Sequence, residues 1–192
     1  MEEREARLIR QAQGGSTIAF SKLVALHDRR VLQLAGQLLN DQRDAEDVYQ
    51  DVFINVYRKL SSFRFESAFS TWLYRIVVNH CINFRKRRTR RDTHEYRVIE
   101  TEDDAPAQFQ TASLDPEREL INRELGEQIN AGIAALSEKQ RAVFVLRHFH
   151  GHKLQDIAKI LDTAEGTVKN YLFRATQHLQ KRLRAYQEDD SF

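Results

Sequence analysis

Apolar side chains in residues 69–84 recur at the spacing of an α-helix. At about 100° per residue, one side of this helix carries Phe69, Trp72, Leu73, Ile76, Val77, Cys81 and Phe84. We predict that this side faces a hydrophobic core. The opposite side carries Thr71, Arg75, Asn79 and Lys86, with Asn83 on its flank and the apolar Val78 and Ile82 among them, and it is a candidate contact surface. Clean alternation of polar and apolar residues, which a half-buried strand requires, is found nowhere in the chain, so we predict an all-α protein.

The segments on either side of this helix carry aromatic and cationic residues. Six of the seven residues in 85–91 are basic, which is more than the end of a helix needs for its dipole. The only acid near them in sequence is Asp92, so we expect the cluster to attract phosphate. Phe63 and Phe65 lie in the preceding loop, where they either anchor the loop to the core or stack on bases. Ser67 or Ser70 is expected to cap the helix. This combination suits single-stranded nucleic acid.

Length and composition favour two small domains. The chain has 192 residues, of which 41% are apolar and 30% are charged, enough for modest cores. Helical patterns fill residues 4–60 and 69–84 and, after a gap, residues 117–184. The gap contains both prolines, lacks helical periodicity, and carries four acids in residues 100–104. We therefore predict an N-terminal domain at 1–95, a flexible acidic linker at 96–116 and a C-terminal domain at 117–192.

Cysteine usage and hydropathy point to the cytoplasm. Cys81 is the single cysteine, which excludes an intramolecular disulfide and fits a reducing compartment. No signal peptide opens the chain, and the longest purely apolar run, residues 142–146, is too short to cross a bilayer.

The helix predicted at 44–60 has a polar side opposite its apolar stripe. That side presents Asp47, Gln50, Asp51 and Asn55. On its own, such an acidic face is ordinarily just solvated.

Residues 154–179 have the pattern of a helix-turn-helix. A short helix with Ile157 and Ala158 inward is followed by a turn at Asp162 and Thr163 and by a longer helix. In that motif the start of the second helix enters the major groove. The groove-facing candidates are Glu165, Gly166, Thr167, Lys169, Asn170, Phe173 and Arg174. Lys169 can donate to guanine, Asn170 can pair with adenine, and Arg174 can contact phosphate. The alternative is an ordinary helical hairpin.

No pattern indicates catalysis, a metal or a cofactor. The chain lacks a glycine-rich phosphate loop, a nucleophile elbow and paired carboxylates. His148, His150 and His152 alternate across Gly151 at a predicted helix end, where alternate residues do not converge on one ion. We expect a non-enzymatic protein without a metal site or a cofactor.

Three segments, residues 44–60, 62–87 and 135–175, resemble in this order the extracytoplasmic-function (ECF) sigma factors of bacterial RNA polymerase. The resemblance implies two helical promoter-binding domains joined by a flexible linker. It further implies that Asp47, Gln50 and Asp51 dock on the clamp coiled coil of the largest polymerase subunit, with Asn55 beside them. The flap of the second-largest subunit and an anti-sigma factor are implied as further partners.

The resemblance also implies roles in promoter DNA. The loop and helix would open and read the minus-ten element as a single strand, through Phe63, Arg64, Phe65, Ser67, Thr71, Arg75, Asn79, Asn83 and Lys86. Phe63 and Asn79 would lie near a flipped base. Residues 165–174 would read the minus-thirty-five element as duplex. Val78 and Ile82, expected to be exposed, would form one docking patch for the anti-sigma factor.

Lys169, Tyr171 and Phe65 depart from residues common in the family, so a promoter sequence does not carry over from a relative. Two other classes stay open at this point: a stand-alone helix-turn-helix regulator of duplex DNA, and a helical interaction protein with an incidental basic run.

Overall fold

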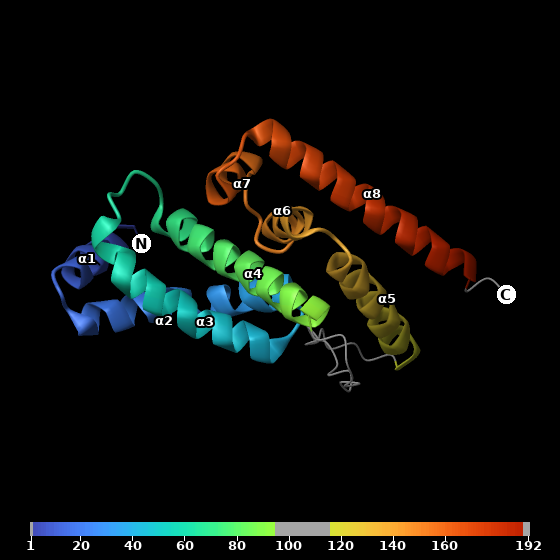
Figure 1. Ribbon diagram of the computed structural model, residues 1–192, viewed down its shortest axis with the longest axis horizontal. Coiled ribbons are helices and arrows are strands. Elements are labelled where there is room, and N and C mark those ends of the chain that lie inside the picture. Colours follow the sequence, from blue (N-terminus) through green and yellow to red (C-terminus); the bar gives the residue numbers. More distant parts are fainter. Residues whose placement is uncertain (1, 95–115, 190–192) are drawn as a thin grey trace.

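The computed structural model describes the backbone of residues 2–94 and 116–189 and the side chains of residues 3–90 and 124–184. Within these ranges every regular element is helical, which confirms the all-α prediction (Figure 1). The elements are α1 (Glu2–Gln13), α2 (Thr17–Leu39), α3 (Gln42–Lys59), the 3-10 turn η1 (Leu60–Ser62), α4 (Phe69–His94), α5 (Pro116–Ala134), α6 (Glu138–His148), α7 (Leu154–Leu161) and α8 (Glu165–Asp189). Apart from Pro116, the predicted linker lies outside the described residues. None of the described helices is both long enough and apolar enough to cross a membrane.

Side-chain caps fix the boundaries of the first helices. Ser16 Oγ accepts a hydrogen bond of 3.2 Å from the backbone N–H of Ala19, and the Asp41 carboxylate accepts one of 2.9 Å from Asp44. Between these two helices Asn40 adopts φ 58°, a left-handed conformation that asparagine tolerates better than most residues. The connection between α2 and α3 is therefore only two residues long.

The predicted serine cap of α4 is wrong. The carbonyl of Ala68 accepts the first helical hydrogen bonds, from Thr71 at 3.0 Å and Trp72 at 3.3 Å. Ser70 lies inside the helix, and Ser67 Oγ instead donates to the carbonyl of Ala68 at 3.4 Å. The chain enters α4 directly from the preceding loop without a side-chain acceptor at Ala68.

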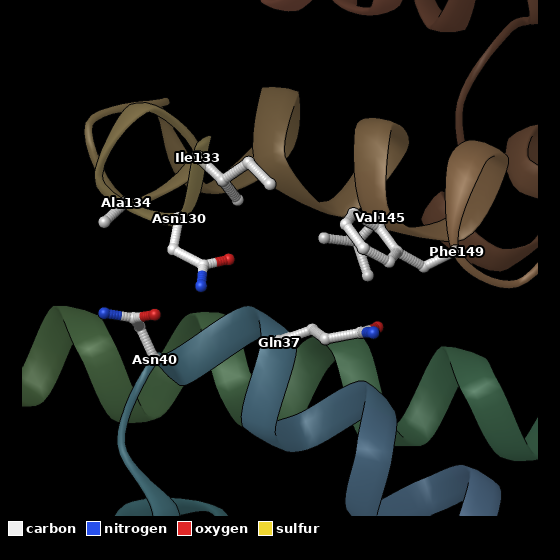
Figure 2. Close-up of a pocket in the computed structure, with 7 residues that line it drawn as sticks. All are labelled: Gln37, Asn40, Asn130, Ile133, Ala134, Val145 and Phe149. Atoms are coloured by element: carbon white, nitrogen blue, oxygen red, sulfur yellow. The ribbon is translucent and has the colours of Figure 1, made fainter. Parts of the chain in front are cut away.

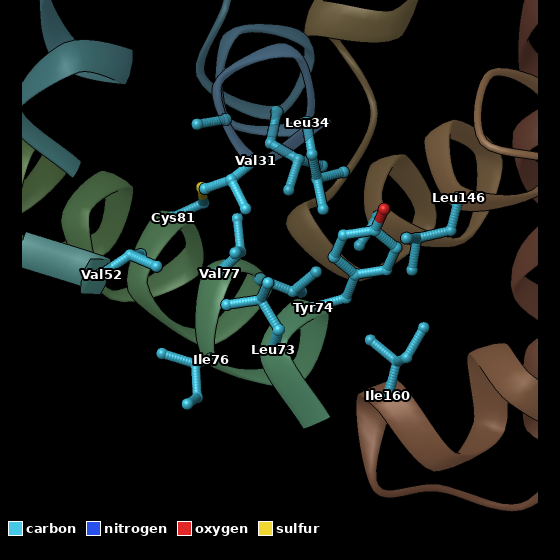
Figure 3. Close-up of a cluster of buried hydrophobic side chains, with 14 of the residues drawn as sticks. Val31, Leu34, Val52, Leu73, Tyr74, Ile76, Val77, Cys81, Leu146 and Ile160 are labelled. Carbon is cyan, nitrogen blue, oxygen red and sulfur yellow. The ribbon is translucent and has the colours of Figure 1, made fainter. Parts of the chain in front are cut away.

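The first core lies among α2, α3 and α4. It contains Val31, Leu34, Val52, Leu73, Val77 and Cys81 (Figure 3). The stripe predicted on α4 is confirmed, since its aliphatic members and Phe69 are buried while Trp72 and Phe84 are partly buried against the same core. Gln13 ties the end of α1 to the loop before α4, because its Nε2 donates to the carbonyls of Leu60 and Phe63 at 2.9 Å each.

The second core lies among α6, α7 and α8. Ile157, Ile160, Val168 and Ala175 are buried there, and α5 crosses α8 at Gly132. A Cβ at Gly132 would lie 2.6 Å from Cδ2 of Leu179, so a larger residue at this position would require the Leu179 side chain to move. The helix α7, the turn at Asp162 and Thr163 and the start of α8 form the predicted helix-turn-helix.

The two helical groups pack against each other, α7 on α4 and α6 on α2. Tyr74 of α4 projects toward Leu146 and Ile160 of the second group (Figure 3). The prediction of an exposed patch at Val78 and Ile82 is wrong, because Val78 is fully buried and Ile82 is half-buried. The periodicity of one helix does not reveal that α2, α3 and α7 all pack against α4.

Candidate nucleic-acid interface

A cluster of aromatic rings holds the loop before α4. Phe63 is only 5% exposed. The centroid of its ring lies 4.9 Å from the ring centroid of Phe65, 5.5 Å from that of Phe69 and 5.3 Å from that of Trp72. Of the two roles considered for Phe63, this geometry favours the loop anchor.

Phe65 is the exposed ring of this loop. It is 41% exposed, and its backbone has φ 60°, a conformation that is costly for a bulky residue and is found mainly where function requires it. The guanidinium of Arg10 lies 5.2 Å from the ring centroid, an arrangement that supports the ring by a cation–π contact. Neighbouring Arg64 is exposed and Ser67 is half-buried.

One side of α4 continues this surface. Arg75, Asn79, Asn83 and Lys86 are exposed along it, and Thr71 is half-buried. Amide and cationic groups in this order can donate to base edges and to phosphates. Arg75 is not free, because its Nη2 lies 2.7 Å from Oδ2 of Asp162, in the turn between α7 and α8.

The basic end of α4 is partly neutralised by acids that are distant in sequence, whereas the sequence offered only Asp92 nearby. Arg88 forms ion pairs with Asp44 and Asp41 at the start of α3, the latter at 3.7 Å. Burial lowers the pKa of the Arg85 guanidinium, which Glu138 partly offsets. The side chains of Lys86, Arg87 and Arg90 are exposed, and that of Arg91 lies outside the described residues.

The polar side of α3 is a second exposed surface. Asp47, Gln50 and Asp51 are exposed, whereas Asn55 is half-buried with its Nδ2 2.8 Å from Nε2 of His80. Burial lowers the pKa of His80.

The sequence analysis did not identify two exposed apolar residues on the same helix as part of this surface. Ile54 and Tyr57 are each 50% exposed on α3, and the ring of Tyr57 packs edge-on against Phe20 at 4.9 Å. Ile54 lies outside the apolar stripe of its helix, and this position could have identified it as an exposed apolar residue. The surface therefore combines carboxylates with an apolar centre, as protein-binding surfaces commonly do.

The turn before α8 has the geometry of a helix-turn-helix. Asp162 adopts φ 52° and its N–H bonds to the carbonyls of Ala158 and Lys159, so α7 ends sharply, and Ala164 then accepts the first hydrogen bonds of α8. Among the predicted groove-facing residues, Gly166, Lys169, Asn170, Phe173 and Arg174 are exposed, and Glu165 and Thr167 are half-buried. Lys169 Nζ pairs with Glu165 at 2.9 Å.

Comparisons with known proteins match both helical groups. The model of Sigma-70 region 2 matches residues 23–91, and that of Sigma-70 region 4 matches residues 126–179. The RNA polymerase sigma-H factor of Pseudomonas aeruginosa is 33% identical over 183 residues, which is 95% of each chain. The ECF RNA polymerase sigma-E factor of Escherichia coli is 33% identical over 177 residues, 92% of each chain.

Solved structures are similar as well. The sigma factor RpoE of Bartonella quintana, solved with the anti-sigma factor NepR, matches with a TM-score of 0.67 at 26% identity over 86% of this chain and 96% of that one. CnrH, solved with the cytosolic domain of CnrY, shares the fold, with a TM-score of 0.67 at 24% identity over 95% of this chain and 98% of that one.

The fold and its exposed faces define a two-domain helical factor for promoter recognition, and its matched regions are those of sigma-70 proteins. The chain belongs to the ECF sigma factors, the non-enzymatic initiation subunits of RNA polymerase. The resemblance seen in the sequence is thereby confirmed, and the stand-alone regulator and the incidental helical protein are set aside.

Proposed function

We propose that the three exposed surfaces divide promoter recognition among them. The polar face of α3 binds the clamp coiled coil of the largest polymerase subunit, the loop before α4 and the exposed side of α4 hold the melted minus-ten strand, and the start of α8 reads the minus-thirty-five duplex. The same division makes residues 1–95 and 117–192 separate functional domains.

The observation that carries this proposal is the exposed Phe65 ring in the loop that leads into α4, a helix whose polar side is also exposed. A strand that follows this surface meets an aromatic face first and then Arg75, Asn79, Asn83 and Lys86. Base stacking on an aromatic ring contributes about 1–3 kcal/mol per base, which offsets the cost of extruding a base, a few kcal/mol.

The roles within the loop are assigned by exposure. Phe65 stacks on the extruded base, because its ring is the accessible one, and Asn79 donates to the edge of that base. Phe63, which the resemblance placed near the flipped base, anchors the loop through its ring contacts. The remaining predicted contacts, Arg64, Ser67 and Thr71, lie along the same path.

On the α3 face, the carboxylates of Asp47 and Asp51 and the amide of Gln50 contact the clamp helices, and Ile54 and Tyr57 fill the centre of the interface. On α8, Asn170 reads adenine while Arg174 contacts phosphate; Lys169 reaches guanine once its ion pair with Glu165 opens. The second domain also contacts the flap of the second-largest subunit.

Control by an anti-sigma factor is inferred from the similarity of this chain to two proteins solved as complexes. The Bartonella RpoE structure contains NepR, and that of CnrH contains the cytosolic domain of CnrY. We extend this kind of partner to the present chain and place its action in the cytoplasm, where the polymerase and the chromosome are.

Binding to synthetic DNA tests the proposal. Promoters are first selected from a random library with core polymerase and the full chain, and run-off transcription confirms them. The holoenzyme should then bind a single-stranded minus-ten oligonucleotide more tightly than a scrambled one at moderate salt, where non-specific attraction is weak. Phe65→Ala should reduce this preference, whereas Phe149→Ala (Figure 2), which removes an exposed ring outside the three proposed surfaces, should leave it unchanged. Equal binding of both oligonucleotides would contradict the assigned surface.

A further inference from the structure

We propose that α1 positions the base-stacking ring of Phe65: Arg10 holds the ring itself, and Gln13 holds the backbone of its loop. The model of Sigma-70 region 2 begins its match at residue 23, so α1 lies before the matched segment. The inference rests on the proposed role of Phe65, since a positioned ring matters to promoter opening only if a base stacks on it.

The helix α1 is fixed to the first helical group along its length. Ile9 and Ala12 are buried in the core. Nearer the start of α1, Oε1 of Glu5 lies 2.6 Å from Nε2 of the buried His27 on α2. A side chain that projects from α1 therefore starts from a backbone that is held in place.

Gln13 acts on the backbone of the loop. Its Nε2 donates to the carbonyls of Leu60 and Phe63 at 2.9 Å each. The carbonyl of Leu60 also accepts a hydrogen bond of 3.0 Å from the N–H of Phe63, so the Gln13 amide braces this turn and fixes the peptide that follows it. Two residues later Phe65 adopts φ 60°, a conformation that a bulky residue keeps only where its surroundings enforce it. Gln13 contributes to that enforcement.

Arg10 acts on the ring. Its guanidinium carbon lies 5.2 Å from the ring centroid of Phe65, which is within the range of a cation–π contact. The ring of Phe63 lies 4.9 Å from the same ring, centroid to centroid, and yet Phe65 is 41% exposed. The ring is thus held by a cation and by a neighbouring ring, and it keeps surface on which a base can stack.

The loop anchor does not depend on Arg10. Phe63 is buried through its contacts with Phe69 and Trp72, whereas Arg10 is exposed, so removing the charge of Arg10 should leave the fold intact. What should change is the fraction of molecules in which the Phe65 ring is in the stacking position. A ring that becomes ordered only when the base arrives lowers affinity, because the cost of ordering it then opposes binding.

The variant Arg10→Gln tests the contact in reconstituted holoenzyme, because it removes the cation and keeps a good helix former. The measured quantity is the ratio of affinities for the selected single-stranded minus-ten oligonucleotide and its scrambled form. This ratio should fall roughly two- to five-fold, the effect of one exposed cation–π contact. Arg10→Lys should restore only part of it, because an ammonium stacks less well on a ring than a planar guanidinium does. Arg7→Gln removes an exposed arginine one turn earlier on α1 and should leave the ratio unchanged.

A double-mutant cycle shows whether Arg10 acts through Phe65. In a chain that already carries Phe65→Ala, Arg10→Gln should have no further effect on the ratio, because the ring that it holds is gone. A direct phosphate contact of Arg10 would behave differently. Affinity for both oligonucleotides would then fall, with or without the Phe65 ring, and the slope of log affinity against log salt concentration would decrease by roughly 0.7. That result would overturn the positioning role.

The variant Gln13→Met tests the second contact. Methionine has a similar length but donates to neither carbonyl, so the loop gains alternative conformations. The ratio of affinities should fall roughly five-fold, the effect of about one lost hydrogen bond, and this loss should also vanish in the Phe65→Ala chain. Gln11→Met makes the same change at an exposed position of α1 and should have no effect.

The outcomes separate this inference from the proposed function. If Phe65→Ala leaves the ratio of affinities unchanged, the stacking role fails, and positioning by α1 fails with it. If Phe65→Ala lowers the ratio but neither Arg10→Gln nor Gln13→Met does, the stacking role stands and positioning by α1 is overturned. Losses in both α1 variants that disappear without the Phe65 ring support both.

Discussion

Replacing the buried Arg141 by methionine should strongly destabilise the C-terminal domain. The guanidinium is 2% exposed and donates to four backbone carbonyls, those of Ile133, Ala134, Leu136 and Leu38. Ile133 and Ala134 are the last two residues of α5 and Leu136 follows them, and carbonyls at a helix end lack a partner within their own helix. Methionine fills similar space but donates no hydrogen bond.

The magnitude follows from two opposing effects. Hydrogen bonds to a charged group contribute about 1.5–3 kcal/mol each, so four of them give an upper bound near 6–12 kcal/mol. Burying the guanidinium costs several kcal/mol, which the methionine variant recovers. We expect a net loss of about 3–5 kcal/mol, the range seen when a buried charged network is broken.

Thermal and denaturant unfolding of the full chain measure this loss. At roughly 4–8 °C per kcal/mol for a domain of 60–100 residues, the transition of the C-terminal domain should fall by more than about 12 °C. Arg147→Met on the same helix removes an exposed arginine with one carbonyl contact and should cost less than about 1 kcal/mol. Equal losses for the two variants would refute the role of the carbonyl network.

Three further results are expected. Asp51→Lys should weaken core polymerase binding at least tenfold, measured with labelled chain, and leave the unfolding transition unchanged; unaltered affinity would contradict the α3 assignment. Asn170→Ala should relax base preference at one minus-thirty-five position by about 1–3 kcal/mol. Arg174→Ala should weaken binding to all sequences and reduce the slope of log affinity against log salt concentration by about one. Identical effects of the two changes would contradict both roles. The pKa of His150 is lowered from 6.5 to about 4, mainly by burial, so this residue binds fewer protons in the folded chain than in the unfolded chain. Its contribution to the free energy of unfolding should therefore be fully present above pH 6.5 and be lost as the pH falls toward 4, as measured by denaturant unfolding, and His150→Gln should flatten this dependence.

Local patterns predicted most of the fold. The apolar stripe of α4 and the short turn at Asp162 depend on residues within a few positions of one another. Helical spacing therefore sufficed for the element types and most of the core. It also identified the exposed face of α3 and the exposed start of α8.

Contacts between distant segments could not be predicted in this way. Arg88 meets Asp44 across 44 residues, and Arg75 meets Asp162 across 87, so a count of nearby acids misses both partners. Val78 is buried because several helices converge on α4. Which of two loop rings turns outward depends on the left-handed backbone of Phe65, which no residue pattern indicates.

Opening of the minus-ten element tests the central claim most directly. With reconstituted holoenzyme, permanganate reactivity of melted thymines is compared on duplex promoters and on templates that already carry a bubble. Phe65→Ala and Asn79→Ala should reduce opening on duplex far more than they reduce initiation on the bubble, because the preformed bubble removes the cost of unpairing, a few kcal/mol. Equal losses on the two templates would contradict base capture by this surface and leave both residues with a structural role.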